Sequence, residues 1–306
     1  MRQYLDLLQD VLDNGTERDD RTGVGTISVF GRQIRFNMAD GFPAVTTKAL
    51  AWKAVVSELL WFLEGSTNEH RLAELKNDGK PYAELTEKER RTIWTDNFEK
   101  QGRDLGYTDG ELGCIYGSQW RHFVSAIEVR DIECLYNRYY QLCIVDQIAD
   151  VIEQIKTNPT SRRLLVSAWN AGVIDQMALP PCHYAFQFYV DGDKLSLMYQ
   201  MRSNDLFLGC PFNIASYALL LHIVAKITGK IPHELIASLG DCHIYKNHIE
   251  QVKEQLTRTP HKLPTLQLPE NADYSNIDTF LKSVKTSDFK LLDYEHDGKL
   301  TAPMAV

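Results

Sequence analysis

The chain has 306 residues, a hydrophobic share of 44%, a charged share of 24% and a formal net charge of −8. This composition is ordinary for a globular protein, and the acidic charge argues against a general nucleic-acid binder, because such proteins neutralise phosphates with clustered basic residues. No run approaches the ~18 apolar residues of a membrane span, and the amphipathic start differs from a secretory signal, so we expect a cytoplasmic protein that binds neither membrane nor DNA.

The N-terminal half combines apolar helices with glycine-punctuated loops. Hydrophobic residues at helical spacing predict a helix over 2–13 and a buried, strongly apolar helix over 51–64. Between these helices, the pattern over 27–36 predicts a strand, a bulge at Gly31 and a second strand. The polar stretch 66–93 predicts a small helical excursion on the surface.

The C-terminal half supplies most of the predicted strands. Residues 122–141 predict an irregular surface insertion, followed by a helix over 142–157. Further on, apolar patterns predict strands over 163–169, 183–190, 194–201 and 235–240, and helices over 213–228 and 246–257. Without a linker or an internal repeat, these elements predict a single α+β domain, residues 1–306, around one large mixed sheet with surrounding helices.

One thiol stands out by its neighbours. The six cysteines include no C-x-x-C pair, so we expect neither a metal site nor a disulfide framework. Cys182 and His183 begin one predicted strand, and Arg202, Ser203 and Asp205 end the next. If these strands pair, the guanidinium lies beside the thiol, lowers its pKa and makes it a nucleophile. The alternative is a buried small hydrophobe, the usual role of a free cysteine.

Glu58 is the second chemical candidate. It lies inside the apolar run 54–63 of a helix that is expected to be buried. A buried carboxyl group has a raised pKa and can move protons near neutral pH. The alternative places Glu58 on the one solvated stripe of that helix.

Four arginines occupy special local settings in this acidic chain. Arg21 lies in a glycine-flanked loop, Arg162 and Arg163 precede a predicted strand, and Arg202 ends another. Each guanidinium offers a fork of donors that matches phosphate oxygens, so together they predict a phosphate site. Adjacent arginines at the start of a strand are, however, usually solvated.

Three polar side chains could recognise the rest of a nucleotide. Asn213 opens a predicted helix, either as its cap or as a carboxamide that matches the edge of a uracil. His243 and Tyr245 share one strand face and can both donate to a sugar hydroxyl. Alternatively, both are polar side chains at a strand end whose hydrogen bonds are satisfied within the protein.

The motifs around these residues occur in an order that is typical of one family. They are Asp20–Gly23, Thr46–Lys48, Glu58–Leu63, Tyr116–Arg121, Ser161–Arg163, Ala178–His183, Arg202–Asp205, Pro211–Tyr217 and Gly240–His248, with Ala302–Val306 at the C-terminus. The whole chain resembles the thymidylate synthase family, most closely over residues 1–260. Details around Trp94–Asn97 resemble bacteriophage members.

The resemblance implies reductive methylation of dUMP to dTMP, with 5,10-methylenetetrahydrofolate as co-substrate and no metal. Cys182 would attack C6 of the uracil and turn C5 into a carbon nucleophile, with Arg202 near the sulfur. The residues expected to bind dUMP are Arg21, Arg162, Arg163, Arg202, Ser203, Asp205, Asn213, His243 and Tyr245. Arg162 and Arg163 would come from the other subunit of a homodimer whose sheets pack face to face.

The resemblance also implies a folate site. Glu58 would organise water and move protons, Tyr116 would help to remove the C5 proton, and Asp205 would hydrogen-bond the pterin. Apolar walls would come from Ile93, Trp94, Leu208 and Phe212, together with Gly209. Lys48 would attract the glutamate tail, and the Val306 carboxylate end would close over the folate and exclude water.

Three positions depart from the family pattern. Gln200-Met201 stands where Tyr-Gln usually precedes the Arg-Ser pair, so no family role is carried onto either residue. Asn97 replaces a frequent tryptophan, which removes one stacking contact to the folate. Ala49 replaces a basic residue, which leaves tail binding to Lys48.

Three alternatives stay open on sequence alone. A deoxypyrimidine-monophosphate hydroxymethylase of the same fold would trap the methylene with water, although Asn213 favours uracil over cytosine. A thiol hydrolase would pair Cys182 with His183, but neighbours on a strand point to opposite faces. A non-catalytic RNA-binding protein fits poorly with the charge of −8.

Overall fold

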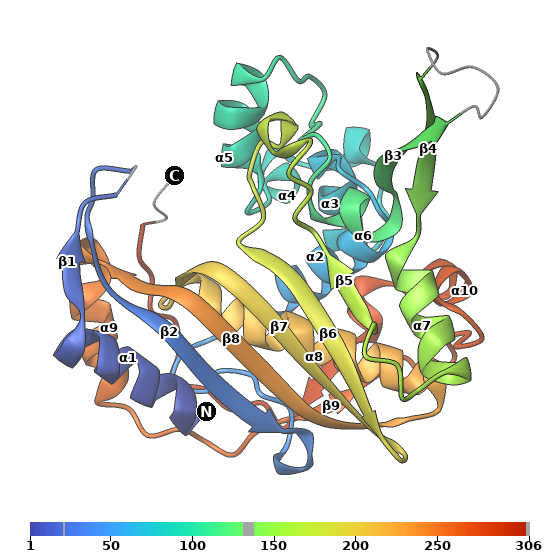
Figure 1. The fold of residues 1–306 in the computed structure, drawn as a ribbon. Coiled ribbons are helices and arrows are strands. Elements are labelled where there is room, and N and C mark those ends of the chain that lie inside the picture. The colour runs from blue at the N-terminus through green and yellow to red at the C-terminus, as the bar shows by residue number, and fades with distance from the viewer. Residues whose placement is uncertain (21, 131–137, 304–306) are drawn as a thin grey trace.

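A computed structural model describes residues 1–20, 22–130 and 138–303. Its centre is a six-stranded sheet in the order β1-β2-β8-β7-β6-β5 (Figure 1). The strands are β1 (Thr16–Arg18), β2 (Thr26–Asn37), β8 (Ile231–Tyr245), β7 (Lys194–Asp205), β6 (His183–Asp191) and β5 (Leu165–Ser167). Only β7 and β8 pair in parallel within this sheet. The predicted α+β class around one large mixed sheet is therefore confirmed.

The two faces of this sheet differ in burial. One row of paired residues across it is buried: Ile34, Ala237, Tyr199, Phe186 and Val166. The next row, on the opposite face, is half-buried or exposed throughout: Arg35, Ile236, Met198, Gln187 and Leu165. Side chains alternate between the two faces along a strand, so these two rows lie on opposite faces of the sheet. The difference in burial shows that helices cover one face and leave the other open.

Helix α8 (Gly209–Thr228) packs against the buried face, where Tyr217 stacks on Tyr199 at 4.3 Å between ring centroids. By length and hydropathy (1.4) this helix could cross a membrane, so the expectation that no run approaches that length is wrong. The helix is 78% buried inside the fold. A helix that is apolar on all sides is typical of a protein core as well as of a bilayer, and here the protein surrounds it.

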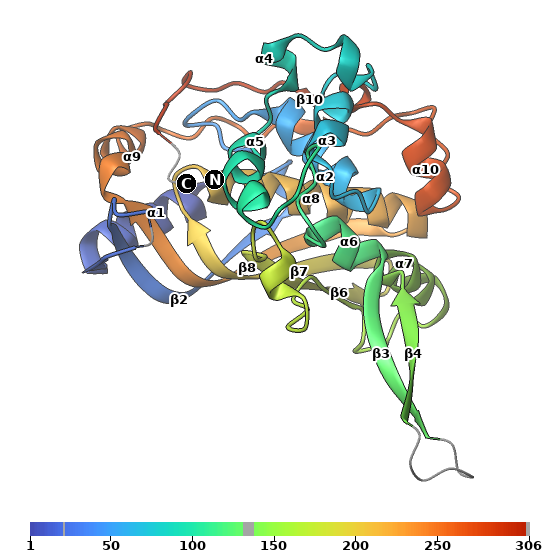
Figure 2. The same ribbon diagram turned by 90° about the horizontal axis from the view of Figure 1, so that it is seen from above.

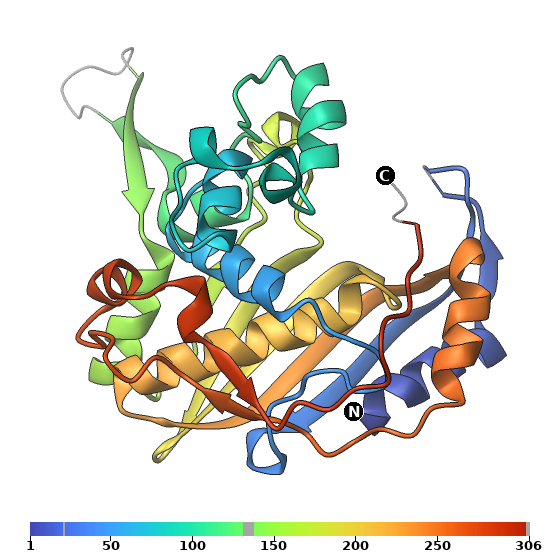
Figure 3. The same cartoon turned by 180° about the vertical axis from the view of Figure 1, so that it is seen from behind.

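The remaining helices lie around this core (Figures 1 and 3). They are α1 (Arg2–Asn14), α2 (Trp52–Leu63), α3 (Glu69–Lys76), α4 (Glu87–Arg90), α5 (Thr95–Asn97), α6 (Tyr116–Arg121), α7 (Gln147–Thr157), α9 (Ile249–Leu256) and α10 (Ile277–Ser283). Short helical turns are η1 (Met38–Asp40), η2 (Tyr82–Glu84), η3 (Phe98–Gly102, a π-helix), η4 (Ile174–Gln176), η5 (Lys246–His248) and η6 (Thr286–Asp288). Strands β9 (Thr265–Gln267) and β10 (Lys290–Leu292) form a separate pair. The predicted excursion over 66–93 contains α3, η2 and α4.

The segment expected to be an irregular insertion is a β-hairpin, so that expectation is wrong. Its strands are β3 (Phe123–Arg130) and β4 (Arg138–Val145), and the following helix therefore begins at Gln147 rather than at 142. Leu142 and Ile144 lie on one face of the hairpin and are 71% and 68% exposed. Figure 2 shows the hairpin projecting away from α8 and α2, past the sheet.

Other boundaries also differ from the predicted ones. The register of β2 against β8 is unchanged across Gly31, so β2 is one strand without a bulge, although Gly31 has a φ of +75°. Strand β8 extends well beyond 235–240, whereas β5 covers only three residues of 163–169. The paired neighbours of a strand, which sequence periodicity does not reveal, decide how far its ladder continues.

Candidate active site

A cleft lies at the ends of β6, β7 and β8, beside α2 and α8. It has a larger compartment of about 650 Å³ and a smaller one of about 330 Å³. Both are lined by Asn97, Leu179, Cys182, Ser203, Asp205, His243 and Tyr245. The thiol of Cys182 therefore lies where the two compartments meet.

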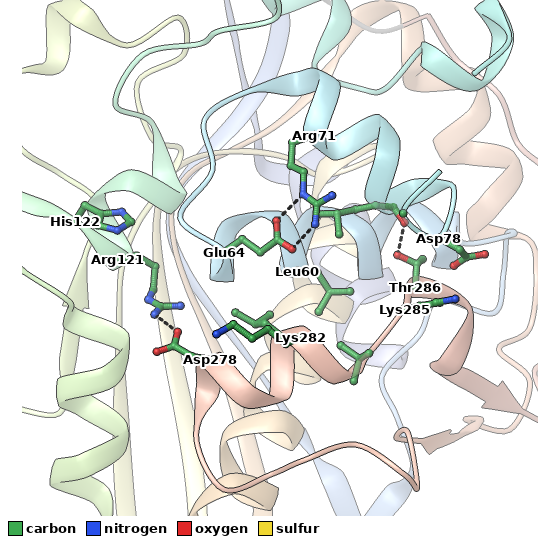
Figure 4. A pocket seen from close by; sticks show the side chains of 14 residues that line it. Leu60, Glu64, Arg71, Asp78, Arg121, His122, Asp278, Lys282, Lys285 and Thr286 are labelled. Atoms are coloured by element: carbon green, nitrogen blue, oxygen red, sulfur yellow. Dashed lines mark hydrogen bonds and ion pairs between the residues drawn. The ribbon is translucent and has the colours of Figure 1, made fainter. Parts of the chain in front are cut away.

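A second cavity of about 650 Å³ lies elsewhere, between α2, α3, α6 and α10 (Figure 4). Its arginines are already paired with carboxylates: Arg71 with Glu64 at 2.8 Å and Arg121 with Asp278 at 2.6 Å. None of the predicted site residues lines it. We therefore place the candidate site in the cleft around Cys182.

The strand pairing brings Cys182 and Arg202 together as predicted. The backbone N–H of Arg202 donates to the Cys182 carbonyl at 2.9 Å, and Nη2 of its guanidinium lies 4.0 Å from Sγ. The same guanidinium donates to the carbonyls of Pro180 and Pro181, each at 2.9 Å, which fixes its position. The Tyr116 hydroxyl accepts from the Cys182 backbone N–H at 2.7 Å.

Burial nevertheless raises the pKa of the Cys182 thiol above its ordinary value, and the opposing effects of Arg202 and Tyr116 are smaller. The predicted lowering of the pKa by Arg202 is therefore present, but the effect of burial is larger. Desolvation of the half-buried thiol costs more than one guanidinium at 4.0 Å restores.

His183 does not activate the thiol. Its Nδ1 lies 2.8 Å from the hydroxyl of Tyr217, and its ring stacks on Tyr116 at 4.1 Å between centroids. Burial lowers the pKa of His183 to about 3, so the ring is neutral and a poor proton acceptor at neutral pH. The thiol hydrolase alternative, which needs a Cys–His pair, gains no support.

Next to His183 the pairing of β6 with β7 shifts register, between His183 and Ala185. Opposite this bulge, Met201 is buried and lines the smaller compartment. Gln200 lies on the open face of the sheet, and its buried Oε1 has no hydrogen-bond partner among the described residues. The register shift thus lies at the position where Gln200-Met201 departs from the sequence pattern of the family.

Glu58 is buried, 6% exposed, on α2, as its apolar helix predicts. Its Oε1 accepts a 2.6 Å hydrogen bond from Nε1 of Trp94. Burial raises the pKa of Glu58 to about 7, and the Trp94 bond opposes part of that rise. A carboxyl group with this pKa can both give and take a proton near neutral pH.

Asn213 lies in the fifth position of α8, because the helix begins at Gly209 and not at 213. The cap interpretation of Asn213 is therefore wrong, and its side chain lines the smaller compartment near Gly209. Two residues of β8, His243 and Tyr245, line both compartments. His243 Nδ1 lies 3.0 Å from Oδ1 of Asp241, which orients the imidazole ring.

Asp205 shapes the turn that joins β7 to α8. Its Oδ1 accepts from the backbone N–H groups of Phe207 and Leu208 at 2.9 and 3.1 Å. Oδ2 has no hydrogen-bond donor among the residues that the structure describes, and the side chain borders both compartments. One carboxylate oxygen thus holds the turn while the other can accept from a ligand.

The smaller compartment has apolar walls that come from distant parts of the chain. They are Ile93, Trp94, Leu208 and Phe212, with Gly209 at the start of α8. The larger compartment is lined mostly by polar side chains and loop residues. The cleft therefore suits a ligand with a polar, charged part next to one with a flat, apolar part.

The comparisons with known proteins agree on one family. The family model described as thymidylate synthase matches residues 2–306. A probable thymidylate synthase of Escherichia phage T5 is 48% identical over 306 residues, and a thymidylate synthase of Enterobacteria phage T4 is 46% identical over 312 residues. Each alignment covers 100% of both chains. The chain belongs to the thymidylate synthase family. The family predicted from the ordered motifs is confirmed.

Not all residues predicted for a thymidylate synthase site lie in the cleft. Arg162 and Arg163 are exposed in the turn before β5 and line neither compartment. Arg21 and Val306 lie outside the described residues.

Lys48 differs most from its expected place. It is 6% exposed, donates from Nζ to the Phe207 carbonyl, and lies 3.6 Å from the centre of the Phe207 ring. Burial lowers the pKa of Lys48 to about 8. In this geometry the ammonium does not reach the cleft, so its contact with a folate tail stays a prediction.

Among the polar residues of the larger compartment that sequence reasoning missed are Arg18, Gln101 and Asp241. Arg18 lies 3.1 Å from Asp241, which in turn contacts His243. The motif Gly240–His248 contained the signal for Asp241, whereas the π-helical turn that carries Gln101 has no sequence signature. Within the described residues, no group of three His, Cys, Asp or Glu could hold a metal ion.

The Trp94–Glu58 hydrogen bond yields a first prediction. In Trp94→Phe the indole N–H is lost, so the pKa of Glu58 rises further and the midpoint of the pH–rate profile assigned to it moves to higher pH. The matched control is Trp52→Phe, which removes an indole donor to the Phe289 carbonyl away from the cleft. An unchanged midpoint in Trp94→Phe would show that this bond does not tune Glu58.

Proposed function

We propose that this chain is a cytoplasmic thymidylate synthase that methylates C5 of dUMP with 5,10-methylenetetrahydrofolate and releases dTMP and dihydrofolate. The observation that carries the proposal is the position of the Cys182 thiol at the junction of a polar and an apolar compartment. The nucleotide would occupy the polar compartment with its base at the junction, and the folate ring would lie against the apolar walls.

The sulfur of Cys182 adds to C6 of the uracil, and the C5–C6 electrons move toward O4. The resulting enolate is nucleophilic at C5 and attacks the methylene carbon of the folate. Covalent addition thus divides one unfavourable step into easier ones. Arg202, 4.0 Å from Sγ, favours the thiolate that this addition needs.

Two groups move protons in the later steps. Glu58, with a pKa of about 7, exchanges a proton with uracil O4 through water as charge builds up there. The Tyr116 hydroxyl, which accepts a hydrogen bond from the Cys182 backbone N–H, helps to remove the C5 proton through water. Loss of that proton and cleavage of the bond between the methylene carbon and the folate nitrogen leave an exocyclic methylene on C5. This methylene accepts a hydride from tetrahydrofolate as the sulfur departs from C6.

The other residues of the cleft orient the two substrates. Asn213 offers one acceptor and two donors to the uracil edge, and His243 and Tyr245 hold the 3′-hydroxyl. Ser203 joins Arg202 and Arg21 at the phosphate. On the folate side, Oδ2 of Asp205 accepts from the pterin. The C-terminal end, Val306, then closes the cleft and excludes water from the intermediate.

Product analysis tests this proposal. Incubation with dUMP and methylenetetrahydrofolate should give dTMP together with an absorbance rise near about 340 nm from dihydrofolate. Hydroxymethyl-dUMP without dihydrofolate would instead identify the hydroxymethylase, which the relatives named thymidylate synthase do not favour.

We also propose a homodimer formed through the open face of the sheet. The half-buried row of Ile236, Met198 and Gln187 has no covering element among the described residues, and the β3–β4 hairpin projects past this side of the molecule (Figure 2). A second copy against that face would bury these side chains. Arg162 and Arg163, exposed before the edge strand β5, would reach the phosphate in the partner's cleft.

Mixing two inactive variants tests this arrangement. Cys182→Ala lacks the nucleophile, and Arg162→Ala/Arg163→Ala lacks the donated arginines. A mixed dimer contains one cleft with both features, so random exchange should restore about a quarter of the wild-type activity. Neither variant mixed with itself should recover activity. Absence of recovery, with subunit exchange verified by mass, would contradict the shared site.

A further inference from the structure

His248 connects the C-terminal end of the chain to the walls of the cleft. It ends η5, directly after β8, and its side chain is fully buried. Its Nε2 lies 2.8 Å from the Pro303 carbonyl oxygen. Because a carbonyl only accepts, Nε2 carries the hydrogen and donates it.

The same imidazole packs against two residues of the cleft region. Its ring centroid lies 5.5 Å from that of Tyr245 and 5.5 Å from that of Phe207. Tyr245 lines both compartments. Phe207 follows the Asp205 turn, and its backbone N–H is bound by Asp205. The His248 ring therefore links the Pro303 carbonyl to Phe207, which directly precedes Leu208 in the apolar wall of the smaller compartment.

The C-terminal segment, residues 294–303, is held firmly only in its first half. Tyr294 donates to the Val45 carbonyl at 2.6 Å, Asp297 donates from its backbone N–H to Thr46 at 3.1 Å, and the Gly298 carbonyl accepts from Ala49 at 2.7 Å. Beyond Gly298, the His248–Pro303 bond is the only hydrogen bond to this segment within the described residues. Figure 3 shows the segment running beside α9.

We infer that His248 is a positioning residue that fixes the end of the C-terminal segment against Tyr245 and Phe207 and so sets the geometry of the folate side of the cleft. It does not touch the reacting atoms. Its Nδ1 is buried without a hydrogen-bond partner among the described residues, so the Pro303 contact is the ring's one polar anchor. The inference rests on the proposed function, because its test measures the KM for methylenetetrahydrofolate.

A pair of substitutions separates the donor from the ring. His248→Phe keeps a flat ring against Tyr245 and Phe207 but cannot donate, whereas His248→Gln keeps an N–H donor near the position of Nε2. We expect His248→Phe to raise KM for methylenetetrahydrofolate roughly 2- to 10-fold, the usual net contribution of one hydrogen bond, with the Kd for dUMP nearly unchanged. His248→Gln should recover most of this loss.

A second readout does not depend on catalysis. Carboxypeptidase should release C-terminal residues faster from His248→Phe than from the wild type or His248→Gln. In a chain shortened to residue 302, His248→Phe should cause no further change in folate affinity, because the bond is already lost. Equal losses in Kd for dUMP and KM for folate, or unchanged carboxypeptidase release, would overturn the inference. If the wild type makes no dTMP, but carboxypeptidase still releases C-terminal residues faster from His248→Phe than from the wild type, only the proposed function is overturned.

Discussion

Cys182→Ala is expected to lower the rate of dTMP formation by a factor of at least about 10³, the largest effect of any single substitution in the cleft. No second thiol can substitute, because among the described cysteines only Cys182 lines either compartment. Folding should be little affected, since the lost sulfur lies at the edge of a cleft rather than in the core. Steady-state kinetics with circular dichroism of both proteins checks this expectation.

Mass spectrometry supplies the sharper form of this test. With 5-fluoro-dUMP and methylenetetrahydrofolate, fluorine replaces the proton that must leave C5, so the adduct should accumulate on residue 182. The matched control is Cys143→Ala, in the hairpin away from the cleft, which should form the adduct at the wild-type rate. A wild type without an adduct on Cys182 would refute the covalent mechanism.

Glu58→Gln should lower kcat by about 10²- to 10⁴-fold, the usual contribution of a positioned general acid or base. The amide can still accept from Trp94, so the local packing survives while proton exchange is lost. The limb of the wild-type pH–rate profile near pH 7 should disappear in the variant. The control is Glu64→Gln at the C-terminal end of the same helix, where the carboxylate pairs with Arg71 outside the cleft.

The same substitution should stabilise the protein at neutral pH. Burial raises the pKa of Glu58 from 4.5 to about 7, so below pH 4.5 the carboxyl is neutral in both states. Between these values the unfolded chain ionises first, so wild-type stability falls as pH rises and levels off above pH 7. Glu58→Gln avoids this loss, about 3 kcal/mol when complete. Thermal unfolding at pH 4 and pH 8 measures it, and equal Tm differences at both values would contradict the raised pKa.

Much of the fold followed from periodicity, and the errors have physical reasons. Helix α2 was predicted to within one residue at either end, because its apolar run is continuous and stops at Gly65. The β3–β4 hairpin was missed because the segment between its strands carries no recognisable turn signal. Helix α8 starts four residues earlier than predicted, because Gly209 and Pro211 discourage an interior helix yet are tolerated in a first turn.

The candidate site likewise combines features that the sequence predicts with features that it does not. The strand pairing that joins Cys182 to Arg202 and the burial of Glu58 were accessible from pattern alone. The net rise in the pKa of Cys182 was not, because desolvation depends on how far the assembled cleft keeps water from the sulfur. The enclosure of Lys48 beneath Phe207 was likewise hidden, since a lysine in a polar motif is normally expected in water.

The hairpin also affects how the protein must be handled. A lone two-stranded ribbon is marginally stable in water, and this one carries Leu142 and Ile144 on an outer surface. Freshly synthesised chains present these side chains to any other unfolded polypeptide. Concentrating the protein therefore raises the risk of aggregation through this ribbon, because contact between exposed apolar side chains of two chains becomes more frequent.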